Sequence, residues 1–214
     1  MTGGLGWTVL VPLRDLGGGK TRLSEWLSPD ERRELTRYAM AAVVAACKQT
    51  QEVERIVVVT GSAEASHWAA DAGVTSWPEP AGRLGLIGVM EAALAAHSDP
   101  LRRIAVLMGD LPLASNAAIA RCLRHADARP VTLVPSRSGA GTNMLAFTAG
   151  AQMPLALGAP NSLAQHRRAA QEAGLRFQTV ASAPLALDVD DADDLRLLAR
   201  VAAARRSLAF LGRF

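Results

Sequence analysis

The sequence predicts an α/β protein with three layers, in which a mainly parallel β-sheet lies between two layers of helices. Two features of the chain predict this fold class. Short apolar runs bounded by turn residues alternate with stretches that have the apolar spacing of helices, which is typical of parallel sheets. Half of the 214 residues are apolar, and no linker, repeat or low-complexity stretch divides the chain. We therefore expect residues 1–214 to form a single domain.

Strands are expected where β-branched and other apolar residues form short runs. Two of these runs, 131–136 and 143–148, are joined by a glycine-containing turn and are expected to form a hairpin. The full set of expected strands is 7–13, 55–61, 103–109, 131–136, 143–148 and 185–190.

Helices are expected between most of these strands. The clearest begins after Ser28, which forms a capping box with Glu31 and has Pro29 at the first helical position. The expected helices are 29–48, 62–72, 85–97, 115–126, 162–173 and 191–206.

The composition excludes several classes of protein. Aromatic residues make up only 4% of the chain, so the basic and aromatic surface of a nucleic-acid-binding protein is not expected. No apolar run reaches the roughly 20 residues that a membrane-spanning helix needs, and the N-terminus does not resemble a signal peptide. Cys47 and Cys122 both fall in helical stretches and indicate no disulfide framework. A cytoplasmic protein is therefore expected.

A glycine-rich turn, "RDLGGGKTRL" at 14–23, follows the first expected strand. It is not a P-loop, because Arg14 stands where that motif has its first glycine and because Ser28 and Pro29 interrupt the following segment. The glycines could simply serve an ordinary loop. However, three in succession leave backbone N–H groups open to a phosphate, and Lys20 is a suitable phosphate ligand. We therefore predict a phosphate-binding turn.

Three aspartates stand at the ends of expected strands. Asp110 follows an apolar strand, and Asp188 and Asp190 alternate along another, so their side chains should share a face. Carboxylates brought together in this way repel each other unless a cation lies between them. Oxygen ligands alone favour Mg²⁺ over Zn²⁺.

The three aspartates that follow Asp190 have a different interpretation. Asp191, Asp193 and Asp194 begin the last expected helix, where negative charge complements the helix dipole. We therefore assign them to capping.

The segment "APNSLAQHRRAA" predicts a further helix start. Asn161 or Ser162 is the expected N-cap, and Gln165 would complete a capping box from Ser162. The start of a helix is also an anion site, which would suit a substrate that carries phosphate and carboxylate. His166 and Arg167 could face this anion or the solvent.

Taken together, these segments resemble the 2-phospho-L-lactate guanylyltransferase family of coenzyme F-420 biosynthesis. The resemblance is carried by "VPLRDLGGGKTRLSEWLSPDERREL", "GDLPL", "GTNML", "NSLAQHRRAA" and "LDVDDADDL", which occur in the family's order. It implies a nucleotidyltransferase fold of the glycosyltransferase-A-like, Rossmann-like type. It also implies that GTP and a phosphorylated three-carbon acid (2-phospho-L-lactate, phosphoenolpyruvate or 3-phosphoglycerate) give a guanosine-diphospho-linked acid and pyrophosphate.

The resemblance also implies roles for individual residues. Asp110, Asp188 and Asp190 match the metal-binding aspartates, for which Mg²⁺ is the expected cofactor, and together with Lys20 they are the expected catalytic residues. The expected nucleotide-binding residues are Leu13, Arg14, Gly17, Gly18, Gly19, Lys20, Arg22 and Gly88. The expected residues of the acceptor pocket are Thr142, Gly158, Asn161 and Ser162.

Two other functions stay open at this point. The chain could be a related nucleotidyltransferase whose acceptor is molybdopterin or a sugar phosphate, or a nucleotide-binding module without catalytic activity. The loops near 78–80 and 85–88 are candidates for selecting guanine. The apolar C-terminal tail could pack on its own domain or on a second subunit of a homodimer, and the product is expected to pass to a downstream transferase.

Overall fold

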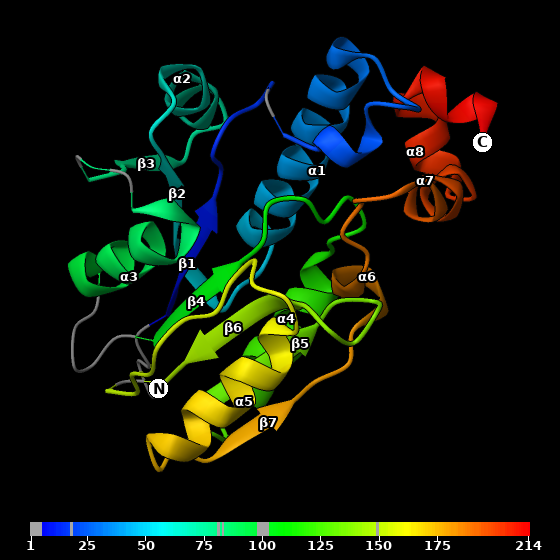
Figure 1. Cartoon of the computed structure of the whole chain (residues 1–214). Coiled ribbons are helices and arrows are strands. Elements are labelled where there is room, and N and C mark those ends of the chain that lie inside the picture. Colours follow the sequence, from blue (N-terminus) through cyan, green and yellow to red (C-terminus); the bar gives the residue numbers. More distant parts are fainter. Residues whose placement is uncertain (1–5, 18, 81, 83, 98–102, 149) are drawn as a thin grey trace.

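The computed structural model describes residues 6–17, 19–80, 82, 84–97, 103–148 and 150–214 (Figure 1). Gly18, one of the predicted nucleotide-binding residues, lies outside these residues. The elements in chain order are β1 (Trp7–Pro12), η1 (Thr21–Leu23), α1 (Pro29–Lys48), β2 (Val53–Thr60), α2 (Ala63–Asp71), β3 (Thr75–Pro78), α3 (Gly85–His97), β4 (Arg103–Leu107), α4 (Asn116–Ala126), β5 (Val131–Pro135), β6 (Thr142–Phe147), α5 (Ser162–Glu172), β7 (Phe177–Thr179), α6 (Ala183–Ala186), α7 (Ala192–Ala199), α8 (Ala202–Ser207) and η2 (Ala209–Arg213).

The strands form one sheet in the order β3-β2-β1-β4-β6-β5-β7. Strand β1 lies between β2 and β4 and is parallel to both. Strand β6 runs antiparallel to its two neighbours, β4 and β5, and the turn between β5 and β6 makes them a hairpin. The mainly parallel sheet and the hairpin are therefore both confirmed.

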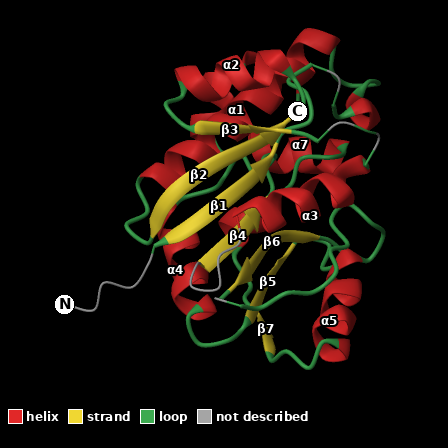
Figure 2. Ribbon diagram, turned by 90° about the vertical axis from the view of Figure 1, so that its left-hand side faces the viewer, coloured by secondary structure: helices red, strands yellow, loops and turns green. Residues whose placement is uncertain are grey.

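Both faces of the sheet are covered by helices (Figure 2). Side chains alternate along β1, so that Val9 and Val11 pack against α1, α2 and α4, whereas Leu10 faces α3 and α5. A strand buried on both faces exposes no side chains to solvent, which explains why Thr8 is the one polar residue of β1. The three-layer prediction is confirmed.

A third apolar cluster holds the C-terminal segment. Helices α7 and α8 and η2 bury Leu195, Leu208 and Leu211 against Leu23 and Leu35 of the N-terminal third (Figure 1). The apolar C-terminal tail thus packs on its own chain. This packing places the segment just before α7 next to the glycine-rich turn.

The predicted elements differ from the observed ones mainly near the C-terminus. The strand expected at 185–190 is wrong: α6 ends at Ala186, and residues 187–190 are irregular. Pro184 suits the first turn of a helix, which explains why an alternating sequence here does not form a strand. The helix expected at 191–206 is interrupted between α7 and α8. Two strands, β3 and β7, were not predicted; they are short and only partly buried.

The local signals at helix starts are mostly reliable. Ser28 and Glu31 form the predicted capping box, in which Ser28 Oγ accepts a hydrogen bond from the Glu31 N–H at 3.3 Å. Cys47 and Cys122 are buried free thiols in α1 and α4. Within the described ranges, no helix combines the length and apolar character needed to cross a membrane.

We predict that the C-terminal cluster contributes substantially to stability. Leu211 is fully buried, so Leu211→Ala should lower the free energy of unfolding by about 2–4 kcal/mol through lost burial and a residual cavity. Leu84→Ala is a matched control, because Leu84 is 47% exposed and should change the free energy by less than about 0.5 kcal/mol. Urea denaturation measures both. Equal effects of the two substitutions would contradict the packing of the tail on its own chain.

Candidate active site

The candidate site lies where β1 and β4 end side by side. The chain leaving β1 forms the glycine-rich turn with Lys20, and the chain leaving β4 carries Asp110. In parallel sheets, ligands bind at this carboxyl edge. The third contributor is the irregular segment 187–190, which carries Asp188 and Asp190.

Lys20 connects these three segments. Its Nζ lies 3.4 Å from Asp110 Oδ2 and 3.5 Å from Asp190 Oδ1, and it donates a hydrogen bond to the Val189 carbonyl at 2.6 Å. Only 7% of the Lys20 side chain is exposed. A buried ammonium between two carboxylates compensates charges that would otherwise repel each other. Lys20 therefore supplies positive charge where the sequence predicts that a cation balances these carboxylates.

The backbone of the turn is adapted to this lysine. Lys20 has a φ of 57°, in the left-handed region that costs a non-glycine residue about 1–2 kcal/mol. Asp15 Oδ1 accepts a hydrogen bond from the Gly17 N–H at 3.0 Å and so stabilises the start of the turn. A Cβ on Gly17 would lie 2.8 Å from the guanidinium at the end of the flexible Arg33 side chain, which would have to shift to admit it.

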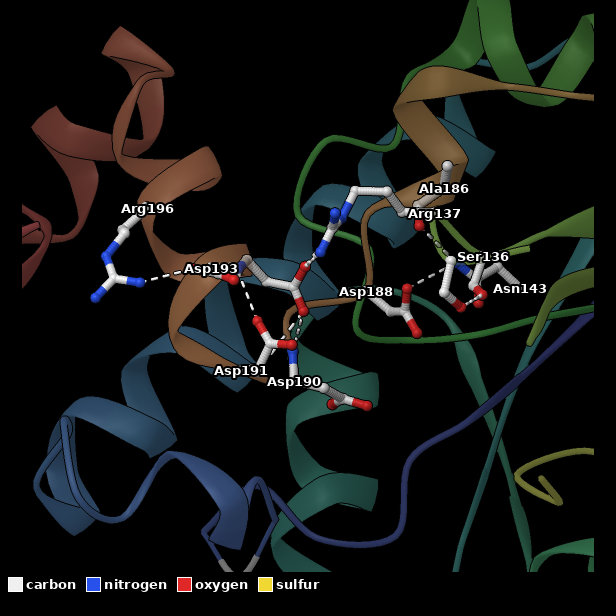
Figure 3. Close-up of polar contacts among 11 residues, drawn as sticks. Ser136, Arg137, Asn143, Ala186, Asp188, Asp190, Asp191, Asp193 and Arg196 are labelled. Carbon is white, nitrogen blue, oxygen red and sulfur yellow. Dashed lines mark hydrogen bonds and ion pairs between the residues drawn. The ribbon is translucent and has the colours of Figure 1, made fainter. Parts of the chain in front are cut away.

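Asp188 is the third carboxylate of the site (Figure 3). Burial raises the pKa of Asp188 above its ordinary value, and the negative charges of Asp110 and Asp190 act in the same direction. Asn143, on β6, donates a hydrogen bond to Asp188 Oδ1 at 3.3 Å, which opposes this rise. Among the described residues, Asp110 Oδ1 is buried with no hydrogen-bond partner. The site therefore retains uncompensated negative charge.

The three following aspartates serve the structure of the segment, as predicted. Asp191 caps α7 and forms a capping box with Asp194, while Asp193 forms an ion pair with Arg196 (Figure 3). Asp194 is buried and also accepts a hydrogen bond from Arg137 at 2.7 Å. Arg137 belongs to the β5–β6 turn, so this contact fixes the segment that carries Asp188 and Asp190.

Two neighbouring cavities open at this edge of the sheet. The smaller, about 200 Å³, brings together Arg14, Gly19, Lys20, Asp110 and Asp190. The larger, about 480 Å³, shares Pro12, Leu13 and Arg14 with it.

The other predicted nucleotide-binding residues lie elsewhere. Gly17 lies in the turn beside Arg33, and Arg22 is exposed on η1. Gly88 lies within α3 against Leu84. Among the described residues, these three do not line either cavity.

The predicted acceptor residues form a second group. Thr142 begins β6, and Ser162 Oγ lies 3.4 Å from Thr142 Oγ1, so the structure brings these two hydroxyls together. Asn161 is exposed and occupies the N-cap position, and Gly158 has a φ of 73°. The capping box predicted from Ser162 to Gln165 is wrong, because Ser162 is turned toward Thr142 and Gln165 donates to the Pro160 carbonyl.

His166 has a role that the sequence did not reveal. It is fully buried, with Nδ1 2.9 Å from Thr142 Oγ1, while Nε2 accepts a hydrogen bond from the Ala156 N–H at 2.8 Å. Since Nε2 is the acceptor, the proton of the neutral ring is on Nδ1, and it is donated to Thr142. Because Thr142 Oγ1 is the acceptor in this contact, its own hydroxyl proton points away from His166. The spacing of His166 along α5 gave no means of predicting this contact.

Comparisons with known proteins identify the family of the chain. The family model described as "Guanylyl transferase CofC like" matches residues 7–213. The chain belongs to this family of CofC-like guanylyl transferases. It is therefore an enzyme, a nucleotidyltransferase.

Curated relatives carry more specific names. The phosphoenolpyruvate guanylyltransferase of Conexibacter woesei is 33% identical over 200 residues, covering 92% of this chain and 89% of the relative. The 2-phospho-L-lactate guanylyltransferase of Methanothermobacter thermautotrophicus is 31% identical over 186 residues, covering 87% and 81%.

Solved structures confirm the predicted nucleotidyltransferase fold. A crystal structure assigned as a nucleotide-diphospho-sugar transferase from Desulfovibrio desulfuricans G20 has a TM-score of 0.75 at 17% identity and covers 97% of this chain and 94% of that one. A complex of Rv0371C from Mycobacterium tuberculosis with manganese has a TM-score of 0.57 at 18% identity, covering 96% and 99%.

We predict that His166 makes the stability of the protein depend on pH. Burial lowers the pKa of His166 to about 4, whereas an unfolded histidine has a pKa near 6.5. Between these values the unfolded chain binds more protons, so stability is complete above about pH 6.5 and decreases as the pH falls toward 4. The free energy of unfolding should fall by about 2 kcal/mol between pH 7 and pH 5 from this group alone.

Urea denaturation of wild type and His166→Asn at the two pH values measures this contribution. The variant should show a smaller decrease than the wild type by about the same 2 kcal/mol. An identical decrease in both proteins would contradict a buried, neutral His166.

Proposed function

We propose that the protein transfers GMP from GTP to a phosphorylated three-carbon acid, with release of pyrophosphate. The observation that supports this most directly is the position of Lys20, whose ammonium lies between Asp110 and Asp190 beside the glycine-rich turn. Such a group can bind a triphosphate and position it at the carboxyl edge of the sheet. The names of the curated relatives support phosphoenolpyruvate or 2-phospho-L-lactate as the acceptor.

In the proposed reaction, a phosphate oxygen of the acceptor attacks the α-phosphorus of GTP in line. The new bond joins this oxygen to the α-phosphorus, and the bond from the α-phosphorus to the oxygen bridging to the β-phosphorus breaks. The attacking oxygen is already anionic, so no side chain has to remove a proton. Lys20 would balance the charge that develops on the leaving pyrophosphate.

The aspartates fit a hard cation such as Mg²⁺. Asp110 Oδ1 is a buried oxygen without a partner in the described part of the chain, and Asp188 lies close enough to Asp110 to sense its charge. In the described ranges, however, no three His, Cys, Asp or Glu side chains form a ready-made metal site. We infer that Asp110, Asp188 and Asp190 would hold Mg²⁺ together with phosphate oxygens of the substrate. The bound ion would polarise the phosphate and offset its charge.

The acceptor is proposed to bind near the start of α5. Thr142 Oγ1 accepts a hydrogen bond from His166 Nδ1–H, so its own hydroxyl can donate to a carboxylate or phosphate oxygen. Ser162 lies next to it, with Gly158 and Asn161 in the preceding loop. The start of a helix of this length also favours an anion.

Further parts of this proposal rest on the resemblance to the family. We infer that the enzyme acts in coenzyme F-420 biosynthesis, in the cytoplasm, and passes its product to a downstream transferase. The single continuous sheet supports one domain over residues 1–214. A homodimer is compatible with a C-terminal tail that is already packed on its own chain.

We predict that Asp110→Asn and Asp190→Asn each reduce turnover by at least about 100-fold, because each removes a carboxylate that positions the triphosphate and its cation. Thermal unfolding should show both variants folded, since neither side chain belongs to an apolar cluster. Glu172→Asn is a suitable control, because Glu172 is exposed at the end of α5. Wild-type turnover in either aspartate variant would contradict the assigned roles.

The function itself is tested by mass spectrometry of the products formed from GTP, Mg²⁺ and a mixture of three-carbon phospho-acids. We expect pyrophosphate and one guanosine-diphospho-linked acid. Parallel reactions supply molybdopterin, a sugar phosphate or CTP instead, and a product formed only in one of these would contradict the proposal. GTP binding without Mg²⁺-dependent turnover on any acceptor would also contradict it.

A further inference from the structure

The larger of the two cavities has no role in the chemistry described above. It lies between the carboxyl ends of β1 and β2, the residues after β3 and the start of α3. Because it shares Pro12, Leu13 and Arg14 with the cavity of Lys20, a ligand with its phosphates on Lys20 can extend into it. Its described lining residues are Pro12, Leu13, Arg14, Val59, Glu79, Gly82, Leu84, Gly85, Leu86 and Val89.

Six of its ten described lining residues have apolar side chains, while Arg14 and Glu79 are charged. Val59 and Val89 are buried in the cluster on that face of the sheet, and Leu86 packs against the same cluster. Leu84 is 47% exposed, and it is one of two large apolar side chains that are exposed among the described residues. Apolar side chains together with a few polar groups form the usual binding environment for the flat ring of a ligand.

Glu79 is the acidic residue of this lining. Its N–H donates a hydrogen bond to the Thr60 carbonyl at 3.2 Å, so its backbone is fixed beside the end of β2. Its carboxylate lies against Gly61, with Oε2 3.2 Å from where a Cβ at that position would be. A glycine at this point leaves room for the carboxylate.

Both carboxylate oxygens of Glu79 are available to a ligand. In the described part of the chain, no hydrogen bond or ion pair involves the Glu79 side chain, whereas nearby Glu64 is paired with Arg33 and Arg37. A partly buried carboxylate that accepts no hydrogen bond from its own protein is a strong acceptor for two adjacent donors.

We propose that this cavity binds the base of GTP and that Glu79 selects guanine by accepting hydrogen bonds from its N1–H and its 2-amino group. This inference rests on the proposed function, because it assumes that a guanine nucleotide is the substrate. Guanine presents two adjacent donors on this edge. Adenine and cytosine place a ring nitrogen with a lone pair next to their amino group, and uracil flanks its single N–H with two carbonyls. Each of these three would bring an acceptor against the carboxylate, which disfavours binding.

Arg14 completes the arrangement. It lines both cavities, so it lies where the base and the phosphates of one nucleotide would meet. Its positive charge offsets the repulsion between Glu79 and the phosphates. The same nucleotide can therefore be bound by an acid at one end and by Lys20 at the other.

The test is the equilibrium binding of GTP, ITP and XTP, measured by dialysis in the absence of an acceptor. ITP lacks the 2-amino group, so the wild type should bind it about 10-fold more weakly than GTP. XTP has a carbonyl in place of that group and should bind still more weakly. In Glu79→Gln, the amide should accept from N1–H and donate to the xanthine carbonyl. We therefore expect about 10-fold weaker GTP binding, about 10-fold stronger XTP binding and a GTP-to-ITP ratio near one.

Glu172→Gln is the matched control and should keep the wild-type order of nucleotides, because Glu172 lies on the surface at the far end of α5. The inference is overturned if Glu79→Gln keeps the wild-type ratios, or if the wild type does not distinguish GTP from ITP. A wild type that prefers GTP through Glu79 but forms no product with any phospho-acid would contradict the proposed function alone.

Discussion

The arrangement of the site depends on one buried ammonium group between carboxylates. Lys20 holds together the turn after β1, the loop after β4 and the segment before α7, which are far apart in the sequence. Without this charge, Asp110, Asp188 and Asp190 would repel one another at the edge of the sheet. The left-handed conformation of Lys20 is a local cost that these contacts offset.

The remaining contacts fix the segment that carries two of these aspartates. Asn143 binds the carbonyls of Leu185 and Ala186 as well as Asp188, and Arg137 binds Asp194 (Figure 3). Both polar residues come from the antiparallel hairpin, the one departure from the parallel sheet among the described strands. Asn143 lies on buried β6 and Arg137 on the turn before it, so both contacts with the segment before α7 come from the hairpin.

Much of this arrangement could be predicted from the sequence. The alternation of strands and helices, the capping box at Ser28 and the aspartates of the α7 start are local signals, and they are confirmed. The strand expected at 185–190 is wrong because an alternating pattern does not reveal the short helix α6, whose last two carbonyls accept hydrogen bonds from Asn143, or the irregular residues 187–190. The contacts of Lys20 with Asp190 and of His166 with Thr142 join residues far apart in the sequence, so the spacing of residues along the chain does not predict them.

The most direct test of this account is a double-mutant cycle on the free energy of unfolding, with Lys20→Met, Asp110→Asn and the double variant, measured by urea denaturation. Because the two groups lie 3.4 Å apart and Lys20 is almost fully buried, we expect a coupling energy of about 1–3 kcal/mol. Single effects that add within about 0.3 kcal/mol would show that the ammonium does not hold the carboxylates together, and would contradict the account.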